Sequence, residues 1–358
     1  MPTIDEQIKE IEEEIKRTKY NKATEHHIGL LKAKLARLKE LKESSKKKGG
    51  SVTGIKKSGN AMVSLVGFPS VGKSTIFNLL TNAHSEVGEY DFTTINAIPG
   101  IMEYKGAKIQ LLDLPGLIEG AAKGRGKGKE ILSIIRNSDL IIIVADVKTP
   151  DVTSILNILY NAGIRLNKKK PRLFLVKKDR GGLNIQKTVP IDIDDDLIKS
   201  IMREFKIVNA DLIIRDKIDI DDLIDFLSGN RVYIPGIFVL NKIDEGFDEN
   251  IKDIVEKYSM IKISAINGEN IETLKESIFN ALDFITVYLK PPGDKIEPMV
   301  IKRYSNVEMV CRSIHKDFVK NFKYAIVNGP SSKYPQQKVG LDHVLEDGDT
   351  ITIYLRKT

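Results

Sequence analysis

One motif constrains the fold of this chain more than any other, the octapeptide Gly67-Phe68-Pro69-Ser70-Val71-Gly72-Lys73-Ser74. It matches GxxxxGKS and lies between an apolar run, 61–66, and a run with helical character, 75–80. A strand, this loop and a helix form the context in which the pattern binds nucleotide phosphates. Its glycines let backbone N–H groups point at phosphate oxygens, and the helix adds the positive end of its dipole. The sequence therefore predicts an α/β nucleotide-binding domain.

Two side chains of this loop have predicted roles. We expect Lys73 to bridge the β- and γ-phosphates and the Ser74 hydroxyl to bind Mg²⁺, a cation that keeps several waters and needs few protein ligands. A second apolar run, 109–112, ends in Asp113-Leu114-Pro115-Gly116. An acid at the end of a strand suits a water-mediated contact with Mg²⁺, and the N–H of Gly116 can meet the γ-phosphate.

Two later segments predict which base is bound. The apolar run 237–240 ends in Asn241-Lys242-Ile243-Asp244, and the Asp244 carboxylate can accept hydrogen bonds from N1–H and the 2-amino group of guanine. Adenine offers neither donor, so a carboxylate here discriminates against ATP. The short run 261–265 ends in Ser264-Ala265, where the N–H of Ala265 can meet guanine O6. Together the ordered motifs predict a site for GTP and GDP.

A threonine between the phosphate loop and Asp113 is expected to sense both Mg²⁺ and the γ-phosphate. Phe92-Thr93-Thr94 lies in that window, with Thr94 as the first candidate and Thr93 as the second. A threonine-rich loop without a ligand role is the remaining interpretation. The predicted catalytic residues are Lys73, Thr94 and Gly116, and the predicted Mg²⁺ ligands are Ser74, Thr94 and, through water, Asp113. The residues predicted to contact the nucleotide are Gly67, Phe68, Pro69, Ser70, Val71, Gly72, Lys73, Ser74, Thr75, Phe92, Thr93, Thr94, Asp113, Leu114, Pro115, Gly116, Asn241, Lys242, Asp244, Ser264, Ala265 and Ile266.

The charge of the chain is unevenly distributed. The 358 residues carry a formal net charge of +7. Residues 1–58 hold 15 Lys and Arg against 9 Asp and Glu, residues 190–230 hold 5 against 11, and residues 290–358 hold 12 against 8. Such differences in net charge between segments indicate separate modules with different partners. The basic balance is compatible with nucleic-acid binding but does not establish it.

Several classes of protein are excluded by composition. One cysteine, Cys311, leaves no internal disulfide framework and no four-cysteine zinc site, and we expect it to be a small buried apolar residue. The strongly apolar run 140–145 is far shorter than the ~20 residues of a membrane span. The N-terminus lacks the apolar centre of a signal peptide. We therefore expect a soluble, cytoplasmic, monomeric protein that does not enter membranes.

The first 58 residues predict an antiparallel hairpin of two helices. Isoleucines recur at helical spacing at positions 4, 8, 11 and 15, and leucines repeat the pattern at positions 31, 35 and 38. Thr24 is a suitable start for the second helix. The polar linker 44–51 contains three consecutive lysines, which fit either a solvated hinge or a nucleic-acid contact.

The motifs together resemble a known family. GFPSVGKS, FTT, DLPGLIEGA and NKID resemble the Obg-related GTPases. The stretches NKATEHHIGLLKAKLARL, YKGAKIQLLDLPG, DDLIDFLSGNRVYIP and FKYAIVNGPSSKYPQQKVGLDHVLEDGD, with the Gly/Lys/Arg segment 124–129, resemble the developmentally regulated GTP-binding (Drg) family. This resemblance extends over nearly the whole chain.

The spacing of the motifs and the resemblance imply four modules. Asp113 and Asn241 are 128 residues apart, whereas two βαβ steps need only about 60, so a domain is inserted between them. The resemblance makes this insertion a small α/β domain like domain 2 of ribosomal protein S5. It makes the tail a TGS domain, a small β-grasp module. The expected divisions are a helical hairpin at 1–58, a P-loop GTPase domain at 59–164 and 232–290, the inserted domain at 165–231 and the TGS domain at 291–358.

The resemblance implies a GTP-hydrolysing switch that acts with ribosomes or RNA in translation. The alternative is a nucleotide-gated scaffold that binds a regulatory protein partner. Leu117 stands where many GTPases have a glutamine that orients the attacking water, so we expect slow hydrolysis. The backbone, another side chain, a partner or a K⁺ ion held at Ser70 are the alternatives for orienting that water.

The Gly-, Lys- and Arg-rich segment 121–129 follows Leu117 and has three interpretations. Arg125 can be supplied in cis to the γ-phosphate, the segment can be a basic switch loop that contacts RNA, or it can be a flexible solvated loop.

Overall fold

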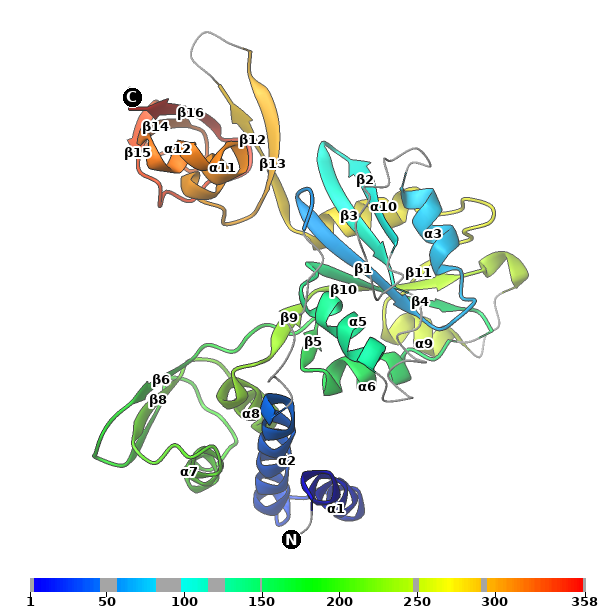
Figure 1. Ribbon diagram of the computed structural model, residues 1–358, viewed down its shortest axis with the longest axis vertical. Helices are drawn as coiled ribbons and strands as arrows, with labels where there is room; N and C mark the ends of the chain where they lie inside the picture. Colours follow the sequence, from blue (N-terminus) through cyan, green and yellow to red (C-terminus); the bar gives the residue numbers. More distant parts are fainter. Residues whose placement is uncertain are drawn as a thin grey trace. The chain divides into compact units, whose positions relative to one another are not determined.

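The computed structural model in Figure 1 contains two compact units. The structure describes residues 3–45, 57–81, 98–114, 126–148, 150–246, 251–290 and 295–356. One unit consists of Met1–Thr53 and Gly163–Tyr233, and the other of Gly54–Ala162 and Ile234–Thr358. Within the described ranges, no helix has both the length and the apolar character needed to cross a membrane.

The larger unit contains a six-stranded sheet with the order β11-β10-β4-β1-β3-β2. Its strands are β1 (Ala61–Gly67), β2 (Ile98–Tyr104), β3 (Ala107–Asp113), β4 (Leu140–Asp146), β10 (Gly236–Asn241) and β11 (Ile261–Lys262). The helices are α3 (Lys73–Leu80), α5 (Gly126–Arg136), α6 (Thr153–Asn161), α9 (Lys252–Lys257) and α10 (Ile271–Ala281), with the 3₁₀ turn η1 (Ile243–Glu245). The central strands β1 and β4 are buried along their whole length, as apolar parallel strands covered on both faces are.

The strands predicted at 61–66, 109–112 and 237–240 are confirmed as β1, β3 and β10. Neighbours in this sheet are parallel, except that β2 pairs antiparallel with β3. Strand β2 was not predicted, because its Pro99 and Gly100 are typical of turns. A Cβ on Gly100 would lie 2.6 Å from Cζ of Phe77, so glycine permits helix α3 to approach this edge strand.

The C-terminal part of the same unit is a five-stranded sheet with the order β13-β12-β16-β14-β15. Its strands are β12 (Phe284–Leu289), β13 (Glu297–Lys302), β14 (Phe322–Asn328), β15 (Gln337–Val339) and β16 (Thr350–Leu355), with helices α11 (Val307–Ile314) and α12 (Lys316–Lys320). Strand β12 precedes the boundary expected at residue 291, because the chain passes from α10 into β12 without a proline or glycine turn. Cys311 is fully buried on α11, as predicted, and burial raises the pKa of its thiol to about 11.

An ionic cluster at Asp139 joins the two sheets of the larger unit. The Asp139 carboxylate accepts the N–H of Met62 at 2.8 Å and contacts the ammonium groups of Lys57 and of Lys302 on β13. The Asp139 side chain is 12% exposed. Burial by itself raises the pKa of Asp139, but hydrogen bonds from Lys302, Lys57 and Met62 outweigh it and hold that pKa below its ordinary value.

Replacing Asp139 with asparagine should lower the free energy of unfolding by about 1–2 kcal/mol at neutral pH, because the half-exposed ammonium groups of Lys57 and Lys302 lose the largely buried carboxylate that they contact. A depressed carboxyl pKa gives stability that is present above the ordinary pKa and is lost as pH falls through the folded-state value. Urea unfolding at neutral and acidic pH should therefore show the difference between wild type and variant shrinking in acid. The matched control is Asp283→Asn, whose pair with Arg303 is about half exposed and should contribute little.

The smaller unit combines the N-terminal helices with the middle of the chain. Its elements are α1 (Ile4–Arg17), α2 (Glu25–Ser45), β5 (Ile164–Leu166), β6 (Leu173–Lys177), β7 (Leu183–Lys187), α7 (Asp195–Glu204), β8 (Ala210–Ile214), α8 (Ile220–Ser228) and β9 (Val232–Ile234). The strands form a β6-β8-β7 sheet and a β5-β9 ribbon.

The predicted antiparallel helical hairpin is confirmed. The ion pairs run in opposite directions along the two helices: Lys42 contacts Asp5, Lys39 contacts Glu12, and His27 contacts Glu14. The hairpin does not stand alone, because Ala33 of α2 belongs to the same hydrophobic core as α7 and α8. A Cβ on Gly29 would lie 3.2 Å from Cδ1 of Leu197, so this glycine permits the close approach of α2.

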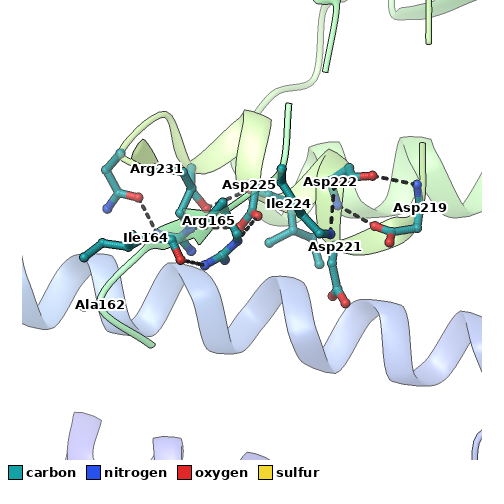
Figure 2. Close-up of polar contacts among 12 residues, drawn as sticks. Ala162, Ile164, Arg165, Asp219, Asp221, Asp222, Ile224, Asp225 and Arg231 are labelled. Atoms are coloured by element: carbon teal, nitrogen blue, oxygen red, sulfur yellow. Dashed lines mark hydrogen bonds and ion pairs between the residues drawn. The ribbon is translucent and has the colours of Figure 1, made fainter. Parts of the chain in front are cut away.

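A buried ionic cluster lies near the two ends of Gly163–Tyr233, the second segment of the smaller unit (Figure 2). Arg165 of β5 donates to Asp225 of α8 through Nε and, at 2.6 Å, through Nη2. Arg231 donates to the same carboxylate at 2.8 Å. The Arg165 and Asp225 side chains are each 4% exposed, so removing one partner would leave an uncompensated buried charge. The cluster therefore fixes helix α8 against strand β5 and against the segment around Arg231.

Candidate functional site

The phosphate-loop residues lie between the end of β1 and the start of α3. Gly72 has φ +91°, a conformation that side chains other than glycine's rarely adopt. A Cβ at this position would lie 2.2 Å from Nδ2 of Asn241, and a Cβ on Gly67 would lie 2.3 Å from the carbonyl oxygen of Val144. No side chain among the described residues caps α3, so its first N–H groups can bind an anion.

Replacing Gly72 with alanine should destabilise the protein by about 1–3 kcal/mol and weaken nucleotide binding. The new methyl group would collide with Asn241, whose amide cannot move without losing two hydrogen bonds. Thermal unfolding and nucleotide titration measure both effects. Gly181→Ala is the control, because Gly181 has φ +108° but nothing within 4 Å of its Cβ position. Equal losses in the two variants would show that backbone strain alone, without the collision, accounts for the effect.

Lys73 is positioned by the curled loop itself. Its Nζ donates to the carbonyl oxygens of Gly67 at 3.1 Å and of Phe68 at 2.7 Å, and the residue is 8% exposed. An ammonium group has three donors, so this geometry leaves capacity for a phosphate oxygen. Burial lowers the pKa of Lys73, and the nearby charge of Asp113 partly opposes that shift.

Ser74 and Asp113 meet at the same end of the sheet. The Ser74 hydroxyl donates to Oδ2 of Asp113 at 2.6 Å. Asp113 is 3% exposed, and its other oxygen, Oδ1, is buried without a hydrogen-bond partner in the described structure. Buried carboxylate oxygens normally have a hydrogen-bond partner, so Oδ1 of Asp113 can accept a hydrogen bond from a water molecule bound to a cation. A hydroxyl beside a carboxylate oxygen is the oxygen donor set that Mg²⁺ prefers, and these residues fit the ion.

Asn241 connects the phosphate loop to the segment after β11. Its Nδ2 donates to the carbonyl oxygen of Val71 at 2.9 Å, and its Oδ1 accepts the N–H of Ala265 at 3.0 Å. The residue is 2% exposed. Asn241 therefore holds the two segments together. The Ala265 N–H, predicted to meet guanine O6, donates to this amide in the structure.

Asp244 and Lys242 follow β10. The Asp244 side chain is exposed, and its Oδ1 accepts a hydrogen bond from the fully buried Ser264 hydroxyl, which orients the carboxylate. Lys242 has φ +64° and pairs with Oδ2 of Asp146 at 2.7 Å. Sequence reasoning missed Asp146. Its position directly after the apolar run 140–145, at the end of a central strand, was the available signal.

Comparison with known proteins gives matches over most of the chain. Residues 62–178 match the family described as 50S ribosome-binding GTPase, residues 180–284 match the C-terminal region of that domain, and residues 285–355 match the TGS domain. An uncharacterized GTP-binding protein of Methanocaldococcus jannaschii is 51% identical, and the alignment covers 99% of this chain and 93% of that relative. Developmentally-regulated GTP-binding protein 1 of Xenopus laevis is 47% identical over 97% of each chain. The chain belongs to the Drg family.

Membership of the Drg family confirms the family resemblance that the sequence motifs indicated. This Drg protein is a GTP-binding P-loop GTPase with a C-terminal TGS domain. Developmentally-regulated GTP-binding protein 2 of Mus musculus is also similar, with 43% identity over 97% of this chain and 98% of the relative.

The structure of the Drg chain brings four predicted segments to one edge of its sheet. They follow β1, β3, β10 and β11 at the carboxyl ends of parallel strands, where open α/β sheets bind their ligands. Val71 and Leu114 are packed into the core, so only their backbone can contact a nucleotide, whereas Pro69, Thr75 and Ile266 are exposed. Seven predicted residues lie outside the described residues: Phe92, Thr93, Thr94, Pro115, Gly116, Leu117 and Arg125.

Proposed function

We propose that this Drg protein is a slow GTP-hydrolysing switch that binds ribosomes or RNA in its GTP-bound state and acts in translation. The observation that supports it best is the convergence of Lys73, the Ser74–Asp113 pair and Asp244 at one edge of the sheet. The ribosome part is supported by the description of the matching family as ribosome-binding and by the basic N-terminal and C-terminal modules.

The roles proposed for the phosphate end follow from the contacts. Lys73 binds the β- and γ-phosphates and stabilises the charge that develops between them during hydrolysis. Ser74 directly and Asp113 through water would hold Mg²⁺, which neutralises phosphate charge when it is bound. Thr94 and Gly116 are proposed to sense the γ-phosphate, so its loss would release the two loops that contain them.

We propose that GTP hydrolysis is slow because the side chain of Leu117 cannot hydrogen-bond to the attacking water. K⁺ held at Ser70 remains an alternative for orienting that water, and Ser70 is exposed in the loop with φ +65°. On this alternative, hydrolysis is faster in KCl than in NaCl at equal ionic strength. Equal rates in the two salts would contradict it.

Co-sedimentation with purified ribosomes tests the switch. The protein should pellet with ribosomes when a non-hydrolysable GTP analogue is bound and remain in the supernatant with GDP. Raising the salt concentration should weaken the association, because basic side chains on phosphates release counterions. Lys73→Ala should lose the difference between the two nucleotides. Association that ignores the nucleotide, or its complete absence, would contradict the ribosome part and favour a scaffold for a protein partner.

A further inference from the structure

Asp146 is a buried carboxylate beside the base segment, which we define as Asn241–Asp244. Strands β4 and β10 are parallel, and their register pairs Asp146 with Asn241. Asp146 is 3% exposed. Its Oδ1 accepts the N–H of Lys148 at 3.2 Å, and its Oδ2 accepts a hydrogen bond from the Lys242 ammonium group at 2.7 Å. Asp146 is therefore oriented by its own loop and connects that loop to the base segment.

Lys242 determines where the base segment turns. It is the residue before the 3₁₀ turn η1, which contains Asp244, and its backbone has φ +64°. A residue with a side chain adopts this left-handed conformation at a cost in free energy, which its surroundings must offset. The Lys242 side chain is 22% exposed, so its ammonium group has lost much of its hydration and needs a counter-charge. The Asp146 carboxylate supplies that charge and so holds the turn.

A second ion pair joins the same two parts of the chain, but it is exposed. Nζ of Lys148 lies 2.5 Å from Oε2 of Glu245, and the two side chains are 73% and 32% exposed. Exposed pairs contribute little, because water and side-chain entropy offset the attraction between the charges. The buried pair between Asp146 and Lys242 is therefore the contact that fixes the base segment to the loop after β4.

We propose that Asp146 is a positioning residue for guanine, which acts through Lys242 on the orientation of the Asp244 carboxylate. The two oxygens of that carboxylate can accept from N1–H and from the 2-amino group only when both face the base, because hydrogen bonds weaken steeply as they bend. The Ser264 hydroxyl holds one of these oxygens, and the turn η1 sets the backbone from which the side chain starts. The inference rests on the proposed role of Asp244 and adds a specificity residue outside the motif that contains it.

Competition between GTP and inosine triphosphate tests the role of Asp146, because hypoxanthine keeps the N1–H of guanine and lacks the 2-amino group. Displacement of a fluorescent guanine nucleotide from the full chain should show that the wild type prefers GTP about tenfold or more, as one hydrogen bond to a charged group provides. Asp146→Ala should weaken GTP binding about tenfold and inosine triphosphate binding less, so the ratio of the two dissociation constants approaches one. Asp146→Asn keeps an oxygen that can accept from Lys242 and should retain most of the preference.

The ratio separates positioning from a general effect on the fold, because a loss of stability alone lowers both affinities alike. Glu245→Gln breaks the exposed pair and should leave the ratio at the wild-type value. Asp139→Asn should do the same, since Asp139 precedes β4 at the end of the strand opposite Asp146. Asp146→Ala/Lys242→Met removes both charges of the buried pair and covers the case in which Asp146→Ala does not fold. Its ratio should also approach one.

The outcomes distinguish this inference from the proposed function. An unchanged ratio in folded Asp146→Ala or in the double variant, with guanine preference lost in Asp244→Asn, would overturn the positioning role alone. Unchanged ratios in both Asp146→Ala and Asp244→Asn would overturn it together with the role of Asp244. A ratio that approaches one in Asp146→Ala, without nucleotide-dependent co-sedimentation with ribosomes, would support the positioning role and contradict the switch.

Discussion

Replacing Lys73 with alanine should lower the rate of GTP hydrolysis by roughly 100-fold or more, the typical loss when one preorganised donor to a developing negative charge is removed. Lys73 is 8% exposed, and the carbonyl oxygens of Gly67 and Phe68 hold its ammonium group in the phosphate loop. Single-turnover hydrolysis of γ-labelled GTP measures the effect. Lys108→Ala is the control, because that side chain is 68% exposed on β3 of the same sheet.

The Lys73→Ala variant should remain folded, because burial of the Lys73 ammonium group destabilises the folded state. Burial holds the pKa of Lys73 below its ordinary value, so the unfolded chain binds the proton more readily. The wild type should therefore gain stability as pH rises from the folded-state pKa toward the ordinary lysine value, and the variant should lack this gain. Urea unfolding across that alkaline range checks the sign. An unchanged hydrolysis rate in a folded variant would contradict the role proposed for Lys73.

The sequence predicted the elements whose pattern is local. Strands β1, β3 and β10 are mainly apolar segments that each end in a motif, and α1 repeats isoleucine at helical spacing, so their existence could be predicted without distant contacts. The phosphate loop was identified for the same reason, since strand, glycine-rich loop and helix are consecutive.

Features that depend on distant residues were not predicted. The packing of Gly29 of α2 against Leu197 brings together parts of the chain that are far apart, and nothing near Gly29 indicates it. Asn241 looked like a nucleotide contact because it stands in a motif, but its amide hydrogen bonds to Val71 and Ala265 are visible only in the fold. Asp146 has no motif of its own, and its pairing with Lys242 depends on the adjacency of β4 and β10.

Replacing Asp244 with asparagine should change which base the site accepts. The carboxylate can accept from both N1–H and the 2-amino group of guanine, whereas an amide turns one acceptor into a donor that faces another donor. GTP affinity should fall roughly 100-fold or more, as sites do when a polar group is left unpaired. Xanthosine triphosphate has a carbonyl oxygen at C2 in place of the amine, so the new amide N–H should find an acceptor there. Displacement of a fluorescent guanine nucleotide by each triphosphate measures the exchange.

We expect Asp244→Asn to change the choice of base without destabilising the protein. Asp244 is exposed, so the substitution should change stability by less than about 0.5 kcal/mol. The Ser264 hydroxyl that donates to Oδ1 of Asp244 can donate equally to the amide oxygen, which keeps the new side chain in place and turns its NH₂ toward the base. Asp253→Asn, an exposed acid on α9, should leave both affinities unchanged. A loss of GTP binding without any gain for xanthosine triphosphate would mean that Asp244 supports the loop and does not read the base.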